Sequence, residues 1–412
     1  MRLDIKMEKA ILVGVNTDKA VQDFNESMSE LNALSETAGA QPVLEVIQNM
    51  DKVHPATYIG KGKLEELSTA VEEFEPDLII FNSELSPSQN RNLSEVLEAR
   101  VIDRTQLILD IFAQRARSKE GKLQVQLAQL EYMLPRLGGQ GVELSRLGGG
   151  IGTRGPGETK LETDRRHIRR EIREIKKRLE QVVRHRAIYR ERRKQNQAFQ
   201  IALIGYTNAG KSTLFNLLAN ADTHEENKLF ATLDPLSRKC VLPSGFETII
   251  TDTVGFIKDL PTSLIASFRS TLEEVKEADF LLHIVDSSHP NHAEHEKTVK
   301  KLLSDLDMDQ IPRMTVYNKE DLLTEDFVAD RTDPFVLMSA VKKEDKKVLS
   351  EIEKEVKHLL KPYSMMISSD DGKVLAQLKN ESMLTKLEFV EENESYIAEG
   401  YISADHPLAG KI

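Results

Sequence analysis

A glycine-bounded loop that ends in lysine and serine is the stretch of this sequence best suited to chemistry. It follows the apolar run 201–204 and precedes an apolar helical pattern at 214–218. Its spacing, G-x-x-x-x-G-K-[ST], is that of a phosphate-binding loop, in which backbone N–H groups at a helix N-terminus point at phosphate oxygens. The alternative is an ordinary glycine-containing turn. The predicted binding residues of the loop are Gly205, Tyr206, Thr207, Asn208, Ala209, Gly210, Lys211, Ser212 and Thr213.

Side chains that suit a magnesium-bound phosphate lie in this loop and after it. Lys211 can supply positive charge to the β- and γ-phosphates, and Ser212 can offer a hydroxyl to Mg²⁺. Asp252 ends the predicted strand 248–251, and Thr232 lies between the loop and Asp252, where a switch threonine belongs. We therefore predict Ser212, Thr232 and Asp252 as metal ligands. Further predicted nucleotide contacts are Phe230, Ala231, Leu233, Asp234, Thr253, Val254 and Gly255.

Two later segments predict which base is bound. Asp321 follows the strand-like run 314–317, and its carboxylate can accept two hydrogen bonds from guanine N1–H and the amino group. Adenine lacks those donors, so a buried Asp321 would stay unpaired and ATP would be rejected. Ala340, after the run 335–338, can add a backbone N–H to guanine O6. Four motifs in this order, each at a predicted strand end, indicate a GTP-binding domain. Its predicted base-side residues are Asn318, Lys319, Glu320, Asp321, Ser339, Ala340 and Val341.

The predicted hydrolysis of GTP to GDP and phosphate lacks one common residue. Many GTPases place a glutamine directly after the glycine of the D-x-x-G motif, here 252–255, to orient the attacking water. In this chain Phe256 occupies that position. We therefore expect slow turnover by the chain alone. Asn208 either holds a K⁺ ion against the phosphates or stabilises the loop backbone. The predicted catalytic residues are Asn208, Lys211, Thr232 and Gly255.

Length and composition limit the other possibilities. A chain of 412 residues has room for two to four domains. Its only cysteine, Cys240, excludes an internal disulfide and a cysteine-based zinc site, which suits a reducing cytosol. The apolar runs are too short to span a bilayer, and the charged start lacks a signal-peptide core. We expect a cytoplasmic protein.

Alternating strand and helix patterns predict an α/β fold with four domains. A small parallel sheet is expected first, with strands at 10–15, 43–47, 78–81 and 101–103. Within it, the segment 58–63 is either an anion site or a glycine turn with solvated lysines. The predicted domains are 1–110, an N-terminal α/β domain; 111–195, a basic helical hairpin with a glycine-rich loop at 137–159; 196–362, the GTP-binding domain; and 363–412, a C-terminal α+β domain.

Two apolar stripes with steps of three and four residues predict long helices that pair as an antiparallel coiled coil. The second helix has 15 Lys or Arg against 6 Asp or Glu over 160–194, a charge of +9 in a chain of −11. This face either binds the phosphates of folded RNA or is merely solvated. The loop between the helices is either a flexible probe or a connector. The stripes comprise Ala113, Ala116, Glu120, Leu123, Leu127, Leu130 and Leu134, and Leu161, Ile168, Ile172, Ile175, Leu179 and Val182.

Several motifs support a family resemblance over essentially the whole length. They are GKGKL at 60–64, DRT at 103–105, LPRL at 134–137, GTRGPGETK at 152–160, the phosphate loop at 205–212 and DTVGF at 252–256. The chain resembles the HflX family of translation-associated GTPases, which is related to the Obg proteins. The resemblance implies binding to the large ribosomal subunit, with ribosomal RNA contacts through the hairpin, and the splitting of stalled or idle ribosomes under stress. With the ribosome as partner, we also expect it to activate GTP hydrolysis.

The resemblance also places the glycine-rich loop near the peptidyl-transferase centre. The tripeptide GGQ at 138–140 repeats that of release factors, unless the match is a coincidence. Family members are credited with ATP use by their N-terminal part, but residues 1–110 contain no second nucleotide motif. The chain is expected to be a monomer. The alternative function is a GTPase switch for a non-ribosomal protein or membrane partner. The membrane version needs an amphipathic helix with aromatics, which the basic helix lacks.

Overall fold

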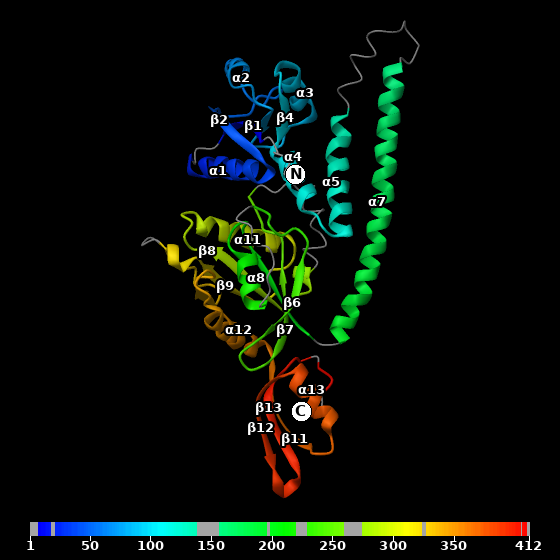
Figure 1. Ribbon diagram of the computed structural model, residues 1–412, viewed down its shortest axis with the longest axis vertical. Helices are drawn as coiled ribbons and strands as arrows, with labels where there is room; N and C mark the ends of the chain where they lie inside the picture. Colours follow the sequence, from blue (N-terminus) through cyan, green and yellow to red (C-terminus); the bar gives the residue numbers. More distant parts are fainter. Residues whose placement is uncertain are drawn as a thin grey trace, which may run out of the picture. The chain divides into compact units, whose positions relative to one another are not determined.

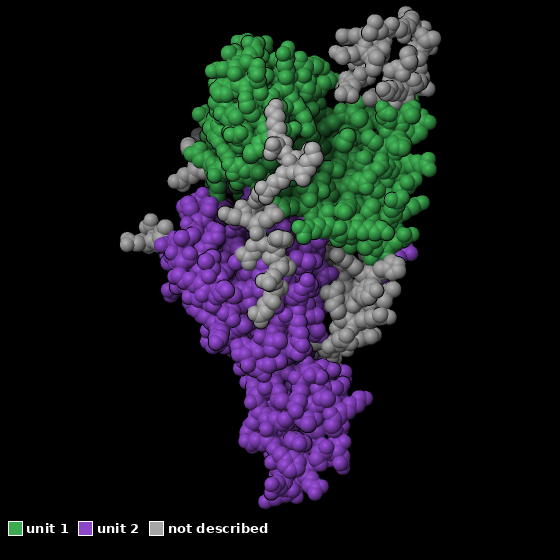
Figure 2. Space-filling model, in the orientation of Figure 1, with its two compact units in different colours: residues 1–183, 259–268 green, residues 184–258, 269–412 purple. Residues whose placement is uncertain are grey.

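The computed structural model forms two compact units (Figure 1, Figure 2). One unit comprises Met1–Val183 with Asp259–Phe268, and the other comprises Arg184–Lys258 with Arg269–Ile412. The described residues are 7–17, 21–137, 156–195, 198–219, 229–258, 274–323, 327–404 and 406–409. Most of the predicted glycine-rich loop, including GGQ at 138–140, lies outside them. No described helix combines the length and apolar character of a membrane span.

The first unit begins with a four-stranded parallel sheet in the order β2-β1-β3-β4. Alternate side chains of β1 face different helices: Ile11 and Val13 join a core cluster with Leu67 and Leu93 of the helices α2 and α3. Helix α1 packs against α4. The elements are β1 (Glu8–Asn16), α1 (Val21–Ala38), β2 (Ala40–Asn49), α2 (Lys61–Phe74), β3 (Leu78–Phe81), α3 (Pro87–Val96), β4 (Arg100–Asp103) and α4 (Arg104–Arg115).

The first predicted hairpin helix is broken in two, close to the predicted domain boundary at 110–111. That boundary falls inside α4, and α5 (Lys119–Arg136) starts a new helix. The Ser118 hydroxyl accepts a hydrogen bond from Gly121 N at 2.8 Å, the arrangement of an N-cap. Helix α4 buries Leu107, Ile108 and Ile111. The spacing of apolar residues by three or four continues through the break. The sequence pattern therefore predicted one helix where the structure has α4 and α5.

Helices α5 and α7 (Pro156–Gln195) lie side by side and antiparallel (Figure 1). Gln126 Nε2 donates to Glu171 Oε1 at 2.8 Å, and Lys176 Nζ lies 2.8 Å from Glu131 Oε1. On α7 the buried apolar side chains are Ile172 and Ile175. On α5 the predicted stripe residues Glu120 and Leu123 are buried, and so are Val125, Ala128 and Tyr132, which the stripe did not include. Because α5 also contacts α3 and α4, it has a second apolar face that the leucine stripe did not predict.

The second unit contains a six-stranded sheet in the order β10-β9-β8-β5-β7-β6, with β6 antiparallel to β7 and the other pairs parallel. The carboxyl ends of its parallel strands therefore meet at one edge, where ligands bind in open α/β sheets. The elements are β5 (Phe199–Gly205), α8 (Lys211–Ala219), β6 (Leu236–Val241), β7 (Glu247–Asp252), β8 (Phe280–Asp286), α11 (His292–Asp305), β9 (Arg313–Asn318), η1 (Glu320–Leu322), β10 (Phe335–Leu337) and α12 (Asp345–Leu359).

The chain ends in a three-stranded antiparallel sheet in the order β11-β13-β12. The Met383 side chain of this sheet belongs to the core cluster of the six-stranded sheet, and Tyr401 packs against that cluster. The predicted boundary at 362–363 falls inside β11, because α12 ends only two residues before this strand begins. The elements are β11 (Lys361–Ser368), α13 (Gly372–Glu381), β12 (Met383–Val390), η2 (Glu391–Asn393) and β13 (Ser395–Ile402).

A histidine lies fully buried on β8. Neither ring nitrogen of His283 has a hydrogen-bond partner among the described residues. Burial, with Lys300 and Arg313 nearby, lowers the pKa of His283 to about 3. A histidine in the unfolded chain has a pKa of about 6.5. Between pH 3 and pH 6.5, therefore, His283 is protonated in the unfolded chain and neutral in the folded chain. The stabilising contribution of the neutral ring is therefore complete above pH 6.5 and is lost as the pH falls toward 3.

We expect the native chain to lose about 2 kcal/mol more unfolding free energy than His283→Leu between pH 7 and pH 5. The change is measured by urea unfolding at both pH values. His358→Leu is the matched control, because the His358 side chain is 76% exposed. An equal pH dependence in the native chain and His283→Leu would contradict this assignment.

Candidate active site

The phosphate-binding loop links β5 to α8, and two of its glycines are required by close contacts. Gly205 has φ +152°, and a Cβ there would lie 2.2 Å from the Ile284 carbonyl oxygen. Gly210 has φ +92°, and its Cβ would lie 2.1 Å from Nδ2 of Asn318. Lys211 is buried at the start of α8, and its Nζ donates to the carbonyls of Gly205 (3.1 Å) and Tyr206 (2.7 Å). The loop thus curls around its own lysine.

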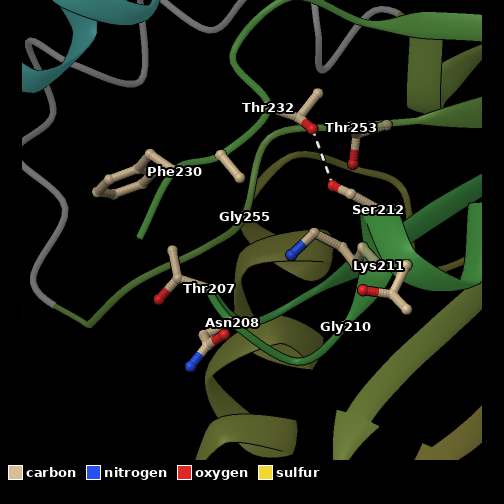
Figure 3. A pocket seen from close by; sticks show the side chains of 11 residues that line it. Thr207, Asn208, Gly210, Lys211, Ser212, Phe230, Thr232, Thr253 and Gly255 are labelled. Carbon is tan, nitrogen blue, oxygen red and sulfur yellow. Dashed lines mark hydrogen bonds between the residues drawn. The ribbon is translucent and has the colours of Figure 1, made fainter. Parts of the chain in front are cut away.

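Eleven predicted site residues line one pocket beside this loop (Figure 3). They come from the loop, from the segment after residue 229 and from the end of β7. Asn208 has φ +61° and is exposed in this pocket. The lining residues are Thr207, Asn208, Gly210, Lys211, Ser212, Thr213, Phe230, Ala231, Thr232, Thr253 and Gly255. Ala209 and Val254 are buried, as is Leu233, and Asp234 is half-buried.

The three predicted metal ligands meet in one hydrogen-bonded cluster. Asp252 Oδ2 accepts from Ser212 Oγ at 2.8 Å and from Thr232 Oγ1 at 2.7 Å. The two hydroxyls lie 2.9 Å apart (Figure 3). Asp252 Oδ1 is buried and has no hydrogen-bond partner among the described residues. Three segments far apart in the chain therefore present hard oxygen donors at one point.

Burial opposes the charges of this cluster. It lowers the pKa of Lys211 to about 8, while nearby Asp252 acts in the opposite direction. Burial also raises the pKa of Asp252, against hydrogen bonds from Thr232 and Ser212 and the charge of Lys211. A buried charge is costly unless it is paired or hydrogen-bonded. Each of the two groups is thus stabilised in its charged form by the other.

The segment after β7 lies directly against the phosphate loop. A Cβ at Gly255 would be 2.9 Å from both Lys211 Nζ and Thr207 Cα, so the backbones approach closely there. Phe256 N donates to Gly205 O at 3.1 Å, and Thr207 N donates to Phe256 O at 2.7 Å. The Phe256 ring is buried, so the structure offers no water-orienting side chain at this position.

One amide side chain joins the phosphate loop to the predicted base-side segments. Asn318 Nδ2 donates to Ala209 O at 3.0 Å, and Asn318 Oδ1 accepts from Ala340 N at 3.0 Å. Lys319 has φ +65°, and its Nζ lies 2.6 Å from Asp286 Oδ2 at the end of β8. Sequence patterns did not predict Asp286, although its place after a buried strand was a usable signal.

Asp321 lies in the 3-10 helix η1 and is exposed, as is Val341, whereas Glu320 of η1 is half-buried. Exposure corrects the premise that Asp321 would be buried. A hydrogen bond from the buried Ser339 side chain lowers the pKa of Asp321. The carboxylate is therefore ionised and oriented at neutral pH, as an acceptor of two donors from one base would need to be.

Comparisons with known proteins agree with this geometry. Residues 25–113 match a family model described as GTP-binding GTPase N-terminal, and residues 115–193 match GTP-binding GTPase Middle Region. Residues 200–319 match a model described as 50S ribosome-binding GTPase. The chain is 55% identical to GTPase HflX of Alkalihalophilus pseudofirmus over 97% of its length and 95% of that protein. The chain belongs to the HflX family of GTPases.

Other relatives extend the match. The chain is 50% identical to GTPase HflX of Caldanaerobacter subterraneus over 95% of its length and 91% of that protein. It is also similar to a solved GTP-binding protein of Sulfolobus solfataricus in complex with GDP. That likeness covers 86% of this chain and 100% of the other, at 24% identity and a TM-score of 0.44. As an HflX GTPase, the chain hydrolyses GTP, and the predicted α/β fold with a phosphate-loop GTPase domain is confirmed.

Base selection is tested by Asp321→Asn. We expect GDP affinity to fall by about tenfold or more, because two charge-assisted hydrogen bonds are lost. Xanthosine diphosphate should gain affinity, since its 2-oxo group accepts a hydrogen bond from an amide. Binding is measured by titration with fluorescent GDP and competition with unlabelled nucleotides. Asp305→Asn, exposed at the end of α11, is the control. Equal affinity of the native chain for ADP and GDP would exclude this role of Asp321.

Proposed function

We propose that this HflX GTPase binds the large ribosomal subunit in its GTP-bound state and splits or rescues stalled or idle ribosomes under stress. Hydrolysis then resets binding. The observation that carries the proposal is a strip of exposed basic side chains on α7. The description of the model matched by residues 200–319, a 50S ribosome-binding GTPase, supports the same partner.

The basic strip follows one side of α7. Arg166, Arg169, Arg173 and Lys177 are exposed and spaced by three or four residues, so they share a face of the helix. Arg170 forms an ion pair with Glu174. Arg169, Arg173 and Lys177 form none with another described residue. In a chain of net charge −11, such a strip attracts phosphate backbones while the remaining surface repels them. Folded ribosomal RNA is the partner that fits this distribution.

The predicted ligand cluster fits Mg²⁺, a cation that prefers hard oxygen donors. Ser212, Thr232 and Asp252 would hold the ion. Oδ1 of Asp252 is buried and has no hydrogen-bond partner among the described residues, so this oxygen is available as a metal ligand. When bound, the ion neutralises charge on the phosphate oxygens. Lys211 would turn its ammonium from the loop carbonyls toward the β- and γ-phosphates. The negative phosphates would favour its protonated form despite burial.

Hydrolysis would depend on backbone groups and on help from outside this site. Gly255 N–H would contact the γ-phosphate, since the Gly255 backbone already lies against Lys211 and Thr207. Phe256 is buried and cannot orient a water. We therefore propose that turnover is slow alone and that the ribosome accelerates it by ordering the segments around Thr232 and Gly255. A K⁺ ion held by Asn208 would add positive charge between the β- and γ-phosphates.

Ribosome binding is tested by co-sedimentation with large subunits in GDP and in a non-hydrolysable GTP analogue. We expect binding with the analogue and a marked loss in the triple variant Arg169→Glu, Arg173→Glu, Lys177→Glu. Each lost phosphate contact should reduce the slope of log affinity against log salt by about one. GDP affinity should stay native.

A charge-matched control is available in the C-terminal segment of the second unit. Lys361→Glu, Lys373→Glu and Lys379→Glu make the same change at exposed positions of β11 and α13. Nucleotide-independent sedimentation of the native chain would contradict GTP-gated binding. An equal salt slope in native and triple-variant proteins would mean that the strip is only solvated.

The cation proposal is tested by GTP turnover in potassium and sodium salts at equal ionic strength. We expect faster turnover in potassium, because sodium is too small for a potassium-sized site, and no difference between salts in Asn208→Ala. Asn380→Ala, on exposed α13, serves as the control and should keep the potassium effect. Equal native rates in both salts would leave Asn208 a role in the loop backbone alone.

A further inference from the structure

Tyr206, the second residue of the phosphate loop, connects three parts of the second unit. Its backbone carbonyl accepts a hydrogen bond from Lys211 Nζ at 2.7 Å. Its backbone pairs with Phe256 in an isolated parallel bridge. Its side-chain hydroxyl accepts a hydrogen bond from the backbone N–H of Lys258 at 2.8 Å. The same residue therefore touches the phosphate-loop lysine and both ends of the segment that follows Gly255.

The Tyr206 ring is held from the side of α11. It stacks on the imidazole of His295, with 3.8 Å between ring centroids and 4° between ring planes. The ring of His289 lies next in line, 4.4 Å from that of His295. Tyr206 is only 5% exposed. Stacking and burial together restrict the ring, which favours one position for its hydroxyl.

This hydroxyl matters because it adds a side-chain contact to the segment after β7. Phe256 provides no polar side chain there, and its contacts with the loop are backbone hydrogen bonds to Gly205 and Thr207. The Tyr206 hydroxyl adds a side-chain hydrogen bond between the loop and Lys258. Small displacements of groups near a reacting phosphate cause large losses of rate. A contact that fixes residues 256–258 therefore acts on the Gly255 N–H.

We infer that Tyr206 is a positioning residue for GTP hydrolysis: its hydroxyl holds the segment 256–258 against the phosphate loop, and His295 braces its ring. The inference rests on the proposed placement of the γ-phosphate beside Lys211 and Gly255. GDP has no γ-phosphate, so Tyr206 contributes to the chemical step and not to diphosphate binding. Its role is distinct from that of Lys211, which would contact the nucleotide in both states.

The test compares single-substitution variants of the full chain. In Tyr206→Phe the ring stack stays and the hydroxyl is lost, so we expect kcat to fall by about tenfold, the equivalent of one hydrogen bond. The KM for GTP and the dissociation constant of GDP should stay within about twofold of native, because phosphate binding is unchanged. His295→Ala should lower kcat in the same direction, and His295→Phe, which restores a ring against Tyr206, should recover it.

Tyr363→Phe is the matched control, since it removes a buried tyrosine hydroxyl bonded to Ser382 in the C-terminal sheet. It should lose comparable stability and keep native kcat. A native kcat in Tyr206→Phe would overturn the inference, and so would equal losses of kcat and GDP affinity, which would indicate a damaged loop. Lys211→Ala separates the two proposals: if it binds GDP as the native chain does, the nucleotide site itself is misplaced.

Discussion

The site depends on the amide of Asn318, which donates to the phosphate loop and accepts from the loop after β10. An amide has both a donor and an acceptor end, so one side chain can join two backbones that a carboxylate or an ammonium could not. Its nitrogen takes the space where any side chain at residue 210 would lie. Gly210 of the loop and Asn318 at the end of β9 therefore depend on each other, and Asn318 fixes the base-side and phosphate-side loops relative to each other.

A second constraint is the burial of opposite charges. Lys211 and Asp252 are both buried, and the charge of each favours the charged form of the other against the cost of burial. Such a preorganised cluster needs little rearrangement when a phosphate and a cation are added. The segment around Thr232 takes part in it, since its hydroxyl bonds Asp252. The position of Thr232 therefore affects how well the buried charge of Asp252 is stabilised.

Motifs and strand patterns predicted much of this site because its chemistry lies in short segments at strand ends. The cluster of Ser212, Thr232 and Asp252 follows from that topology. Contacts between segments without a motif could not be predicted: the stack of Tyr206 on His295 spans 89 positions, and Asp286 pairs with Lys319 across neighbouring strands. The break at Ser118 was hidden because apolar spacing continued through it. Asp321 lies in η1, just beyond the end of β9, and its exposure is a property of packing that the motif does not contain.

The packing of Met383 has a consequence for where this chain can be cut. Its fully buried side chain fills part of the core below the six-stranded sheet, in one cluster with Val348, Ile352 and Val356 of α12. A fragment that stops at the end of α12 would have an open hole at this place, and removal of a buried large side chain leaves the surrounding core undersupported. The C-terminal sheet thus contributes to the core of the nucleotide-binding fold. Its loss or displacement would loosen the packing of α12 against that core.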